Sequence, residues 1–371
     1  MKNSLIFCFI FFCFTNSYSQ TAEEYLVKGN EKFDKDDFKA AIIDYSKSIE
    51  IKFNYSEAFF NRGLAKFLLE DYNGAILDFT KVIQLNSTNE LAYKQRGKSK
   101  HKLNDYKGAI LDFNKAIEIN PSNELTYNER GYSKYELNDY KEAILDYTNA
   151  IDLNPVYEDA FFNRAQAKWE LKDHSGAILD FNKAIEIEPN SPENYNNRGV
   201  LKYLLLDYNG AILDFTKAIE LNPNDEDMYL RRGTSKFQLG DYRGAILDCN
   251  KVVEINPNYE LAYQQRGRSK SQLGDYRGAI LDFTKAIGIN PSFEYAYELR
   301  GGSKYDLKDY QGAILDYTKV LQLNPNNELA FLKRGLAKIF VNQKDSGCLD
   351  LSKAGELGNK DAYEMIKKHC N

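Results

Sequence analysis

The sequence has few of the residues that most enzymes use for catalysis or metal binding. Its three histidines, His101, His174 and His369, lie far apart and do not have the spacing of metal ligands. It contains no Gly-rich phosphate loop, no HExxH or CxxC motif and no nucleophile elbow. We therefore predict that the protein is not an enzyme and that it has neither a metal site nor a cofactor.

The sequence also lacks a large excess of one charge. It has 49 basic and 54 acidic residues, so that its net charge is -5. Proteins that bind nucleic acid usually carry a strong positive charge on one face. We therefore do not expect nucleic acid as a partner.

Long hydrophobic runs are absent except at the N-terminus. There Lys2 is followed by ten apolar residues, 5–14, and then by the small residues Ser17 and Ser19 at the third and first positions before Gln20. This pattern predicts a secretory signal peptide, residues 1–19, that is removed after Ser19. The run is shorter than the roughly 20 residues that cross a bilayer, so we expect no membrane span after cleavage. We expect a periplasmic or secreted protein; a retained anchor is the alternative.

The rest of the chain is dominated by one motif, which in its clearest copy, residues 275–291, reads DYRGAILDFTKAIGINP. Its AILD core recurs every 34 residues, with alanine in nine copies and Gly347 in the tenth. A constant period of this length indicates one supersecondary unit that stacks on its neighbours in an elongated domain. We assign residues 20–360 to ten repeats, which start at residues 22, 56, 90, 124, 158, 192, 226, 260, 294 and 328.

Each repeat is predicted to form two helices. The first has an aromatic residue at position 4 of the repeat and, in nearly every copy, Gly at position 8. The second is predicted to begin after an Asp at position 16, which is a good N-cap, and to end before a Pro at position 32. Gly usually stands at position 19, where it costs roughly 1 kcal/mol of helix propensity. We expect it there because the first helix approaches closely.

These features resemble the tetratricopeptide repeat (TPR): an aromatic at 4, Gly at 8, Ala at 20, an aromatic at 24, Ala at 27 and Pro at 32. The resemblance covers residues 22 to about 361. It implies an all-α solenoid, a right-handed superhelix of antiparallel helix pairs whose first helices line a concave groove. This chain departs from the family pattern at position 7, which is Arg in place of the usual Leu, and at position 11, which is Lys in place of an aromatic.

An Asp occupies position 23 in all ten repeats. It lies on the helix face that also carries the small alanines, and the Arg and Lys of the first helix are one turn apart. We predict that the three side chains, for example Arg62, Lys66 and Asp78, form an ion-pair ladder. Cation binding by the regularly spaced carboxylates is the alternative.

The resemblance places positions 2, 5, 9, 12 and 13 of each repeat on the groove. Several of them are aromatic or apolar, and others carry amides that can satisfy the backbone of a bound peptide. The alternative is that the aromatic side chains only pack against the next repeat. The candidate partner-binding residues are Phe60, Phe67, Tyr135, Phe162, Trp169, Asn196, Tyr203, Leu230 and Phe237.

The third repeat places basic residues at these positions. We expect Lys94, Lys98, His101 and Lys102 to form a basic groove pocket that receives an acidic segment or a carboxylate, with a solvated surface as the alternative.

At the C-terminus, residues 361–371 are predicted to form a capping helix that covers the last repeat. Cys348 and Cys370 each lie 11 residues from Asn359. Two antiparallel helices with arms of equal length bring these residues level, so we predict a disulfide between them. Cys249 takes the place of the aromatic at position 24, and we expect a buried thiol there.

The leading functional hypothesis is therefore an exported, non-catalytic scaffold that binds a protein or peptide partner in its groove. The alternative is a receptor or carrier for a small molecule or glycan, with aromatic residues such as Trp169 as stacking platforms. The sequence leaves the partner and the oligomeric state open.

Overall fold

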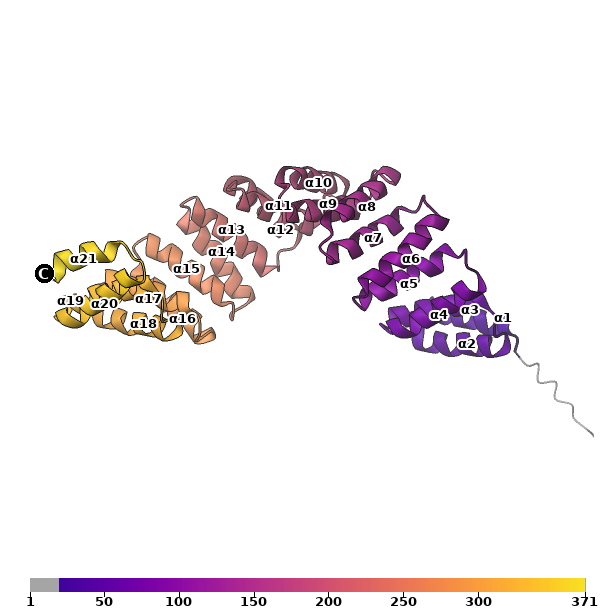
Figure 1. The fold of residues 1–371 in the computed structure, drawn as a ribbon, viewed down its shortest axis with the longest axis horizontal. Coiled ribbons are helices and arrows are strands. Elements are labelled where there is room, and N and C mark those ends of the chain that lie inside the picture. Colours follow the sequence, from indigo (N-terminus) through magenta and orange to yellow (C-terminus); the bar gives the residue numbers. More distant parts are fainter. Residues whose placement is uncertain (1–19, 371) are drawn as a thin grey trace, which may run out of the picture. The chain divides into compact units, whose positions relative to one another are not determined.

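The computed structural model describes residues 20–370, and every regular element in that range is an α-helix (Figure 1). The predicted signal peptide, residues 1–19, lies outside the described residues. In chain order the helices are α1 (Ala22–Phe33), α2 (Phe38–Ile51), α3 (Ser56–Leu68), α4 (Tyr72–Leu85), α5 (Glu90–Lys102), α6 (Tyr106–Ile119), α7 (Glu124–Glu136), α8 (Tyr140–Leu153), α9 (Glu158–Glu170), α10 (His174–Ile187), α11 (Pro192–Leu204), α12 (Tyr208–Leu221), α13 (Glu226–Gln238), α14 (Tyr242–Ile255), α15 (Glu260–Gln272), α16 (Tyr276–Ile289), α17 (Glu294–Asp306), α18 (Tyr310–Leu323), α19 (Glu328–Phe340), α20 (Lys344–Glu356) and α21 (Asp361–His369).

Two helices form each repeat, and the odd-numbered helices α1 to α19 begin at the ten repeat starts. The described residues divide into two compact units, residues 20–180 and 181–370. From α1 to α9 in the first unit and from α11 to α21 in the second, each helix packs on the next one. The first helices of successive repeats within a unit also touch each other. Each unit is thus a stack of antiparallel helix pairs, which is the predicted all-α architecture.

The second helix of most repeats begins with the predicted Asp cap. In α4, Asp71 Oδ1 accepts a hydrogen bond of 2.9 Å from the backbone N–H of Gly74. A Cβ on Gly74 would lie 2.1 Å from Asp71 Oδ2. In α8, where Glu142 replaces this glycine, Asp139 makes no side-chain cap hydrogen bond.

This corrects one expectation. Glycine at position 19 lies beside the capping carboxylate of its own helix and not against the first helix, although Asp37 also caps an alanine, Ala40 of α2, at 3.1 Å.

The close approach of the two helices occurs instead at position 8. In the third repeat, a Cβ on Gly97 would lie 2.8 Å from Cε1 of Phe113, the aromatic at position 24. Phe113 is completely buried, together with Ala109 and Ala116 one turn to either side of it. In most repeats the core is therefore an aromatic ring that packs against a glycine of the first helix, between two small residues of its own helix.

The C-terminal helix α21 packs on α19 and α20. Its Ala362 is fully buried in a cluster with Leu332, Leu351 and Ala354 of the last repeat. The structure joins Cys348 to Cys370 by a disulfide, with the two Cα atoms 5.8 Å apart. Cys249 is a free, buried thiol.

Candidate binding surface on the first helices

The Asp at position 23 is buried and fully engaged in ion pairs. Asp112 accepts two hydrogen bonds from Arg96, of 2.9 and 2.6 Å, and lies 2.7 Å from Nζ of Lys100. Nine repeats have this bidentate Arg–Asp pair, and all ten have the Lys–Asp pair. The first repeat has Lys28 at position 7, over the ring of Tyr25. Arg and Lys therefore occupy the oxygens of these carboxylates, and no free carboxylate is left there to bind a cation.

The ladder also connects neighbouring repeats. The remaining guanidinium nitrogen of Arg96 donates to Oγ1 of Thr80 in the preceding repeat at 3.1 Å. The guanidinium carbon of Arg96 lies 5.5 Å from the ring centroid of Tyr93, which is one turn earlier on the same helix. One arginine thus orders its own repeat, the previous repeat and the aromatic at position 4.

A cavity of about 360 Å³ opens on the first helices of the sixth and seventh repeats, in the second unit. The predicted groove residues Tyr203 and Leu230 lie on its wall, and Phe215 is the aromatic at position 24 beneath it. Its lining residues stand at positions 9, 12 and 13 of one repeat and 2, 5, 6 and 9 of the next: Val200, Tyr203, Leu204, Asp227, Leu230, Arg231 and Thr234, with Tyr259 following.

The cavity has an apolar wall and a charged rim. The Tyr259 hydroxyl donates a hydrogen bond to Oδ1 of Asp227. Burial, and then this hydrogen bond, raises the pKa of Tyr259 to about 12, so its proton stays in place. Arg231 is exposed, and its guanidinium makes no hydrogen bond or ion pair within residues 20–370. The site therefore offers an apolar recess beside an unpaired guanidinium.

Smaller cavities lie at the same positions of other repeats. One of about 300 Å³ in the first unit is lined by Asn30, Phe33, Asn61 and Leu64, among others. Asn30 Oδ1 there accepts hydrogen bonds from Asn61 and from the Tyr45 hydroxyl, at 3.0 and 2.9 Å. Another, of about 230 Å³, lies between the ninth and tenth repeats. Recesses between successive first helices thus occur at several places along the described residues.

The other predicted aromatics are half-buried and make internal contacts. Phe67, Tyr135, Tyr203 and Phe237 each meet the aromatic at position 17 of their own repeat edge-on, at 5.2 or 5.3 Å between centroids. Phe60 meets the buried ring of Phe79 edge-on in the same way, at 5.6 Å.

Contacts with the next repeat also occur. The Arg268 guanidinium lies 4.5 Å from the Phe237 ring centroid, and Gln238 donates to the Tyr203 hydroxyl at 3.3 Å. Phe162 and Trp169 are half-buried on α9. Asn196 carries a buried Oδ1 that has no hydrogen-bond partner among the described residues. Packing within and between repeats therefore uses much of the predicted aromatic strip.

The four residues expected to form a basic pocket are mostly paired or partly buried in the structure. Lys98 forms a 3.0 Å ion pair with Glu129 of the next repeat, and Lys94 lies 4.0 Å from Glu90. Burial lowers the pKa of His101, whose Nδ1 lies 2.9 Å from the Ser133 hydroxyl.

Lys102 alone among the four is exposed. The carboxylates of the same and the next first helix therefore neutralise most of this region, because Glu at positions 1 and 6 lies within reach of the lysines.

Arg231 and Tyr259 lie outside the predicted groove positions, whereas Asp227 stands at groove position 2 but was not among the predicted binding residues. Position 6, which Arg231 occupies, was not assigned to the groove, and Tyr259 lies at position 34, just before the next first helix. An Asp and an Arg four residues apart at the start of α13 were the available signal. Their roles became visible only with the cavity that they border.

No helix among residues 20–370 has the length and apolar character needed to cross a bilayer. Within the same residues there is no cluster of His, Cys, Asp and Glu that could hold a metal ion.

Solved structures of other TPR proteins are similar to parts of this chain. The C-terminal part of a TPR repeat-containing protein from Cytophaga hutchinsonii is 22% identical, with a TM-score of 0.57 over 64% of this chain and 97% of that chain. A TPR protein from Parabacteroides merdae is also 22% identical, with a TM-score of 0.49 over 67% of this chain and 98% of that chain. YrrB, described as a TPR protein with an unusual peptide-binding site, is 22% identical and has a TM-score of 0.46 over 50% of this chain and 95% of that chain.

A comparison with the curated proteins found no match. Models of the tetratricopeptide repeat match residues 56–89, 91–123, 128–192, 192–225, 226–259, 261–293 and 295–327. These matches cover most of the chain in the register of the helix pairs, and the protein belongs to the tetratricopeptide repeat family.

Proposed function

We propose that the protein is an exported, non-catalytic scaffold that binds an extended or helical segment of a partner protein on its first helices. Proteins of this family are generally non-catalytic interaction scaffolds. The observation that carries the proposal is the 360 Å³ cavity between the sixth and seventh repeats. Six of its nine lining residues stand at positions that the family resemblance assigned to the groove.

The chemistry of this cavity suits a peptide side chain. Leu230, Val200 and the Tyr203 ring supply apolar surface, and burying an aliphatic side chain there is worth about 1.5–3 kcal/mol. Arg231 at the rim can pair with a carboxylate of the same segment. Asp227 is already engaged by Tyr259, so it does not neutralise the arginine through a direct ion pair.

Affinity capture tests this proposal: the mature protein is used as bait in the native envelope fraction, and the captured proteins are quantified by mass spectrometry. Leu230→Arg places a charge in the cavity and is expected to reduce recovery of the partner at least tenfold. Leu153→Arg, at a position that is 42% exposed on a second helix of the first unit, is the matched control and should leave recovery unchanged. Equal recovery with both variants would contradict a partner in this cavity.

Small-ligand binding is the competing function, because a cavity of 360 Å³ is within the range of small-molecule sites. A glycan array, or native mass spectrometry of the purified protein, distinguishes the two. A ligand that is lost in Leu230→Arg, without any captured protein, would favour a carrier.

Export is the second part of the proposal. It is supported by the N-terminal pattern of a signal peptide and by the Cys348–Cys370 disulfide, since disulfides persist mainly in oxidising compartments. We expect the mature protein to begin at Gln20, which N-terminal sequencing of protein from the native host will check. A mature chain that retains residues 1–19 would indicate an anchored protein.

A further inference from the structure

Every repeat exposes one large aliphatic side chain at position 22, on the second helix. These side chains are between 56% and 72% exposed, although the residues on either side of them in the AILD core face inward. These side chains neither pack in the core nor line the first-helix cavities. The row consists of Ile43, Leu77, Leu111, Leu145, Leu179, Leu213, Leu247, Leu281, Leu315 and Leu349. Apolar side chains repeated in this way on a surface often mark an interaction site.

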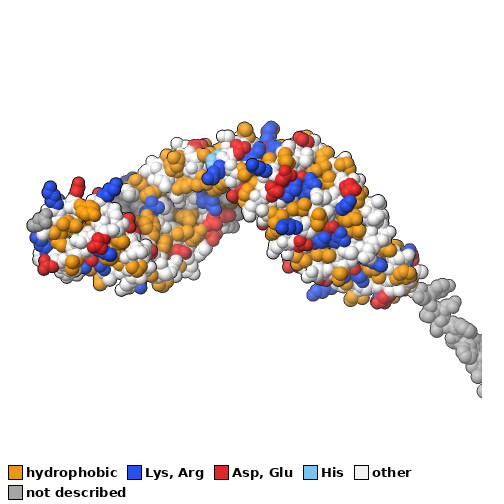
Figure 2. Space-filling model, in the orientation of Figure 1, with side chains coloured by type: hydrophobic (Ala, Val, Ile, Leu, Met, Phe, Trp, Pro, Cys, Tyr) orange, Lys and Arg blue, Asp and Glu red, His pale blue; other side chains and the backbone are white. Residues whose placement is uncertain are grey.

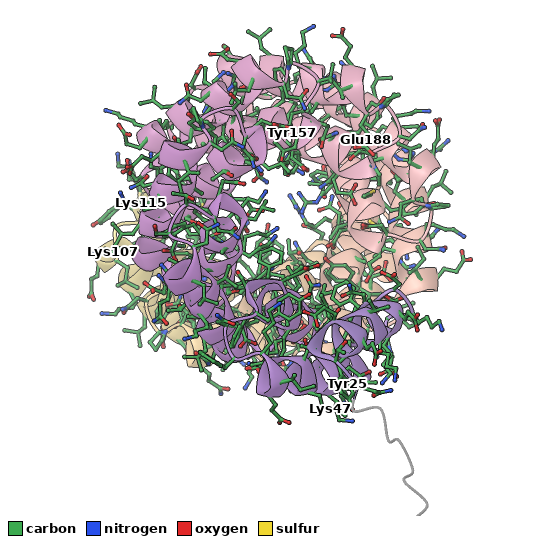
Figure 3. All side chains as sticks on the ribbon, turned by 90° about the vertical axis from the view of Figure 1, so that its right-hand side faces the viewer. Tyr25, Lys47, Lys107, Lys115, Tyr157 and Glu188 are labelled. Carbon is green, nitrogen blue, oxygen red and sulfur yellow. A yellow bond between two sulfur atoms is a disulfide. The ribbon has the colours of Figure 1, made fainter. Side chains whose placement is uncertain are left out.

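Charged residues flank each of these side chains on the same helix face. Position 26 lies one turn further along and is usually Lys, and position 29 is often Glu. In five repeats the two form an exposed ion pair, for example Lys115 with Glu118 at 2.6 Å. Figure 3 shows Lys107 and Lys115 of α6 extending outward from this side of the first unit. In these repeats the lysine charge is balanced locally.

The eighth repeat departs from this pattern. Gly288 replaces the glutamate, and the Lys285 ammonium has no hydrogen bond or ion pair among the described residues. A Cβ on Gly288 would meet no atom within 4 Å. A hollow of about 580 Å³ lies here, lined by Leu281, Thr284, Lys285, Gly288 and Ile289 of α16 and by Asn258. Leu281, at its edge, is 71% exposed.

The charge around this hollow is positive. Positions 18, 26 and 29 of the seventh, eighth and ninth repeats carry five basic residues and one acidic residue, although the whole chain has a net charge of -5. In the fourth repeat the same three positions carry one basic and one acidic residue. The residues of the basic outer face are Arg243, Lys251, Glu254, Arg277, Lys285 and Lys319, around Leu247, Leu281 and Leu315.

We propose that this basic outer face of repeats 7–9 docks an acidic, amphipathic segment of a partner protein. An apolar side chain of the segment fills the hollow beside Leu281, and its carboxylates pair with Arg277 and Lys285. The hollow favours a protein side chain over a flat lipid surface, and the charge favours an acidic partner over a second copy of this basic face. The surface is separate from the first-helix cavity and does not depend on what that cavity binds.

The size of the surface sets the expected affinity. Three exposed leucines and a hollow form an interface below about 1,200 Å², which is typical of transient complexes. Because exposed charges contribute, binding should weaken as the salt concentration rises.

Fluorescence anisotropy with a labelled synthetic peptide tests the proposal on the full mature protein. The probe is an 18-residue amphipathic helix with Leu on one face and Glu on its flanks, and the reference peptide has Lys in place of Glu. Gly288→Glu restores the usual Lys–Glu pair, fills the hollow and improves helix propensity, so it should not harm folding. We expect Gly288→Glu and Arg277→Glu each to weaken binding of the acidic peptide at least tenfold.

Two matched controls accompany these variants. Lys141→Glu changes the same position in the fourth repeat as Arg277→Glu does in the eighth, and Leu230→Arg changes the first-helix cavity; neither should alter binding of the acidic peptide. The proposal is overturned by equal binding of both peptides, by no binding at about 100 μM peptide, or by an unchanged affinity in Gly288→Glu. It is also overturned if vesicles of anionic phospholipid, and not the peptide, bind in a manner that Gly288→Glu abolishes.

Discussion

At the residue scale, a buried carboxylate holds each repeat together. The Asp112 side chain is 5% exposed, and the Arg96 and Lys100 side chains that meet it are 17% and 22% exposed. The sequence predicted the three partners from their constant positions. The sequence did not reveal the hydrogen bond from Arg96 to Thr80 of the previous repeat, because this bond depends on how two repeats stack.

Asp112→Ala is expected to lower the free energy of unfolding by about 3–5 kcal/mol, because it leaves two partly buried cations unpaired. Glu118→Ala on the same helix is the control, since its ion pair with Lys115 is more than half exposed and should contribute less than about 1 kcal/mol. Urea denaturation followed by circular dichroism measures both. Similar midpoints for the two variants would show that the ladder is not a stabilising core feature.

A second residue-scale contrast involves the glycine at position 8. Gly97→Ala would bring a Cβ 2.8 Å from the Phe113 ring, and such overpacking typically costs about 1–3 kcal/mol. In the seventh repeat Cys249 replaces the ring, and the nearest atom to a Cβ on Gly233 is 3.2 Å away. Gly233→Ala should therefore cost clearly less than Gly97→Ala, with helix propensity offsetting part of the tighter contact. Thermal denaturation of the two variants checks the difference, and equal losses would contradict it.

At the element scale, helix boundaries follow local chemistry. Asp caps, the glycines that accommodate them and the prolines after each second helix were readable from the sequence, because capping involves residues only a few positions apart. The reason for glycine at position 19 was not readable, since it depends on where the Asp71 carboxylate points. The pairing of Lys98 with Glu129 was missed for a similar reason: it joins two helices.

The terminal helix α21 gives an element-scale prediction. The disulfide closes a loop with a sequence separation of 22 residues, and the chain-entropy model assigns about 3 kcal/mol to a loop of this length. Cys370→Ser should therefore loosen α21 from Leu332 and Leu351 while the earlier repeats stay folded. Hydrogen exchange should show faster amide exchange in residues 361–369 alone. Unchanged protection there would mean that packing by itself holds the helix.

At the scale of the whole molecule, each repeat is stabilised by packing against the repeats next to it in the sequence. The contacts within each unit join successive helices and successive first helices, as expected for a stack of repeats. The surface in Figure 2 mixes apolar, basic and acidic side chains over the visible face of both units. We therefore expect recognition to depend on local departures from the repeat, such as Arg231 and Gly288, and not on one extended patch.

Deletion of one complete repeat, residues 90–123, should leave a folded protein. Asn89 would then precede Glu124 and take the N-cap place of Asn123, and Thr80 would face Arg130 as it now faces Arg96. Circular dichroism should show the same helix signal per residue, with a small loss of stability. Deletion of residues 90–105, a single helix and turn, is the control and should disrupt the first unit. A full-repeat deletion that is equally disruptive would contradict repeat-wise stacking.

The sequence by itself determined the family, the 34-residue register, the two helices of each repeat and the residues of the ion-pair ladder. It could do so because these features depend on residue types at constant spacing, ten times repeated. The tertiary structure alone decided which face residues line a cavity, which lysines keep a free charge and where a missing side chain leaves a hollow. Those properties arise between side chains of different helices, and the distances that govern them exist only once the helices have packed.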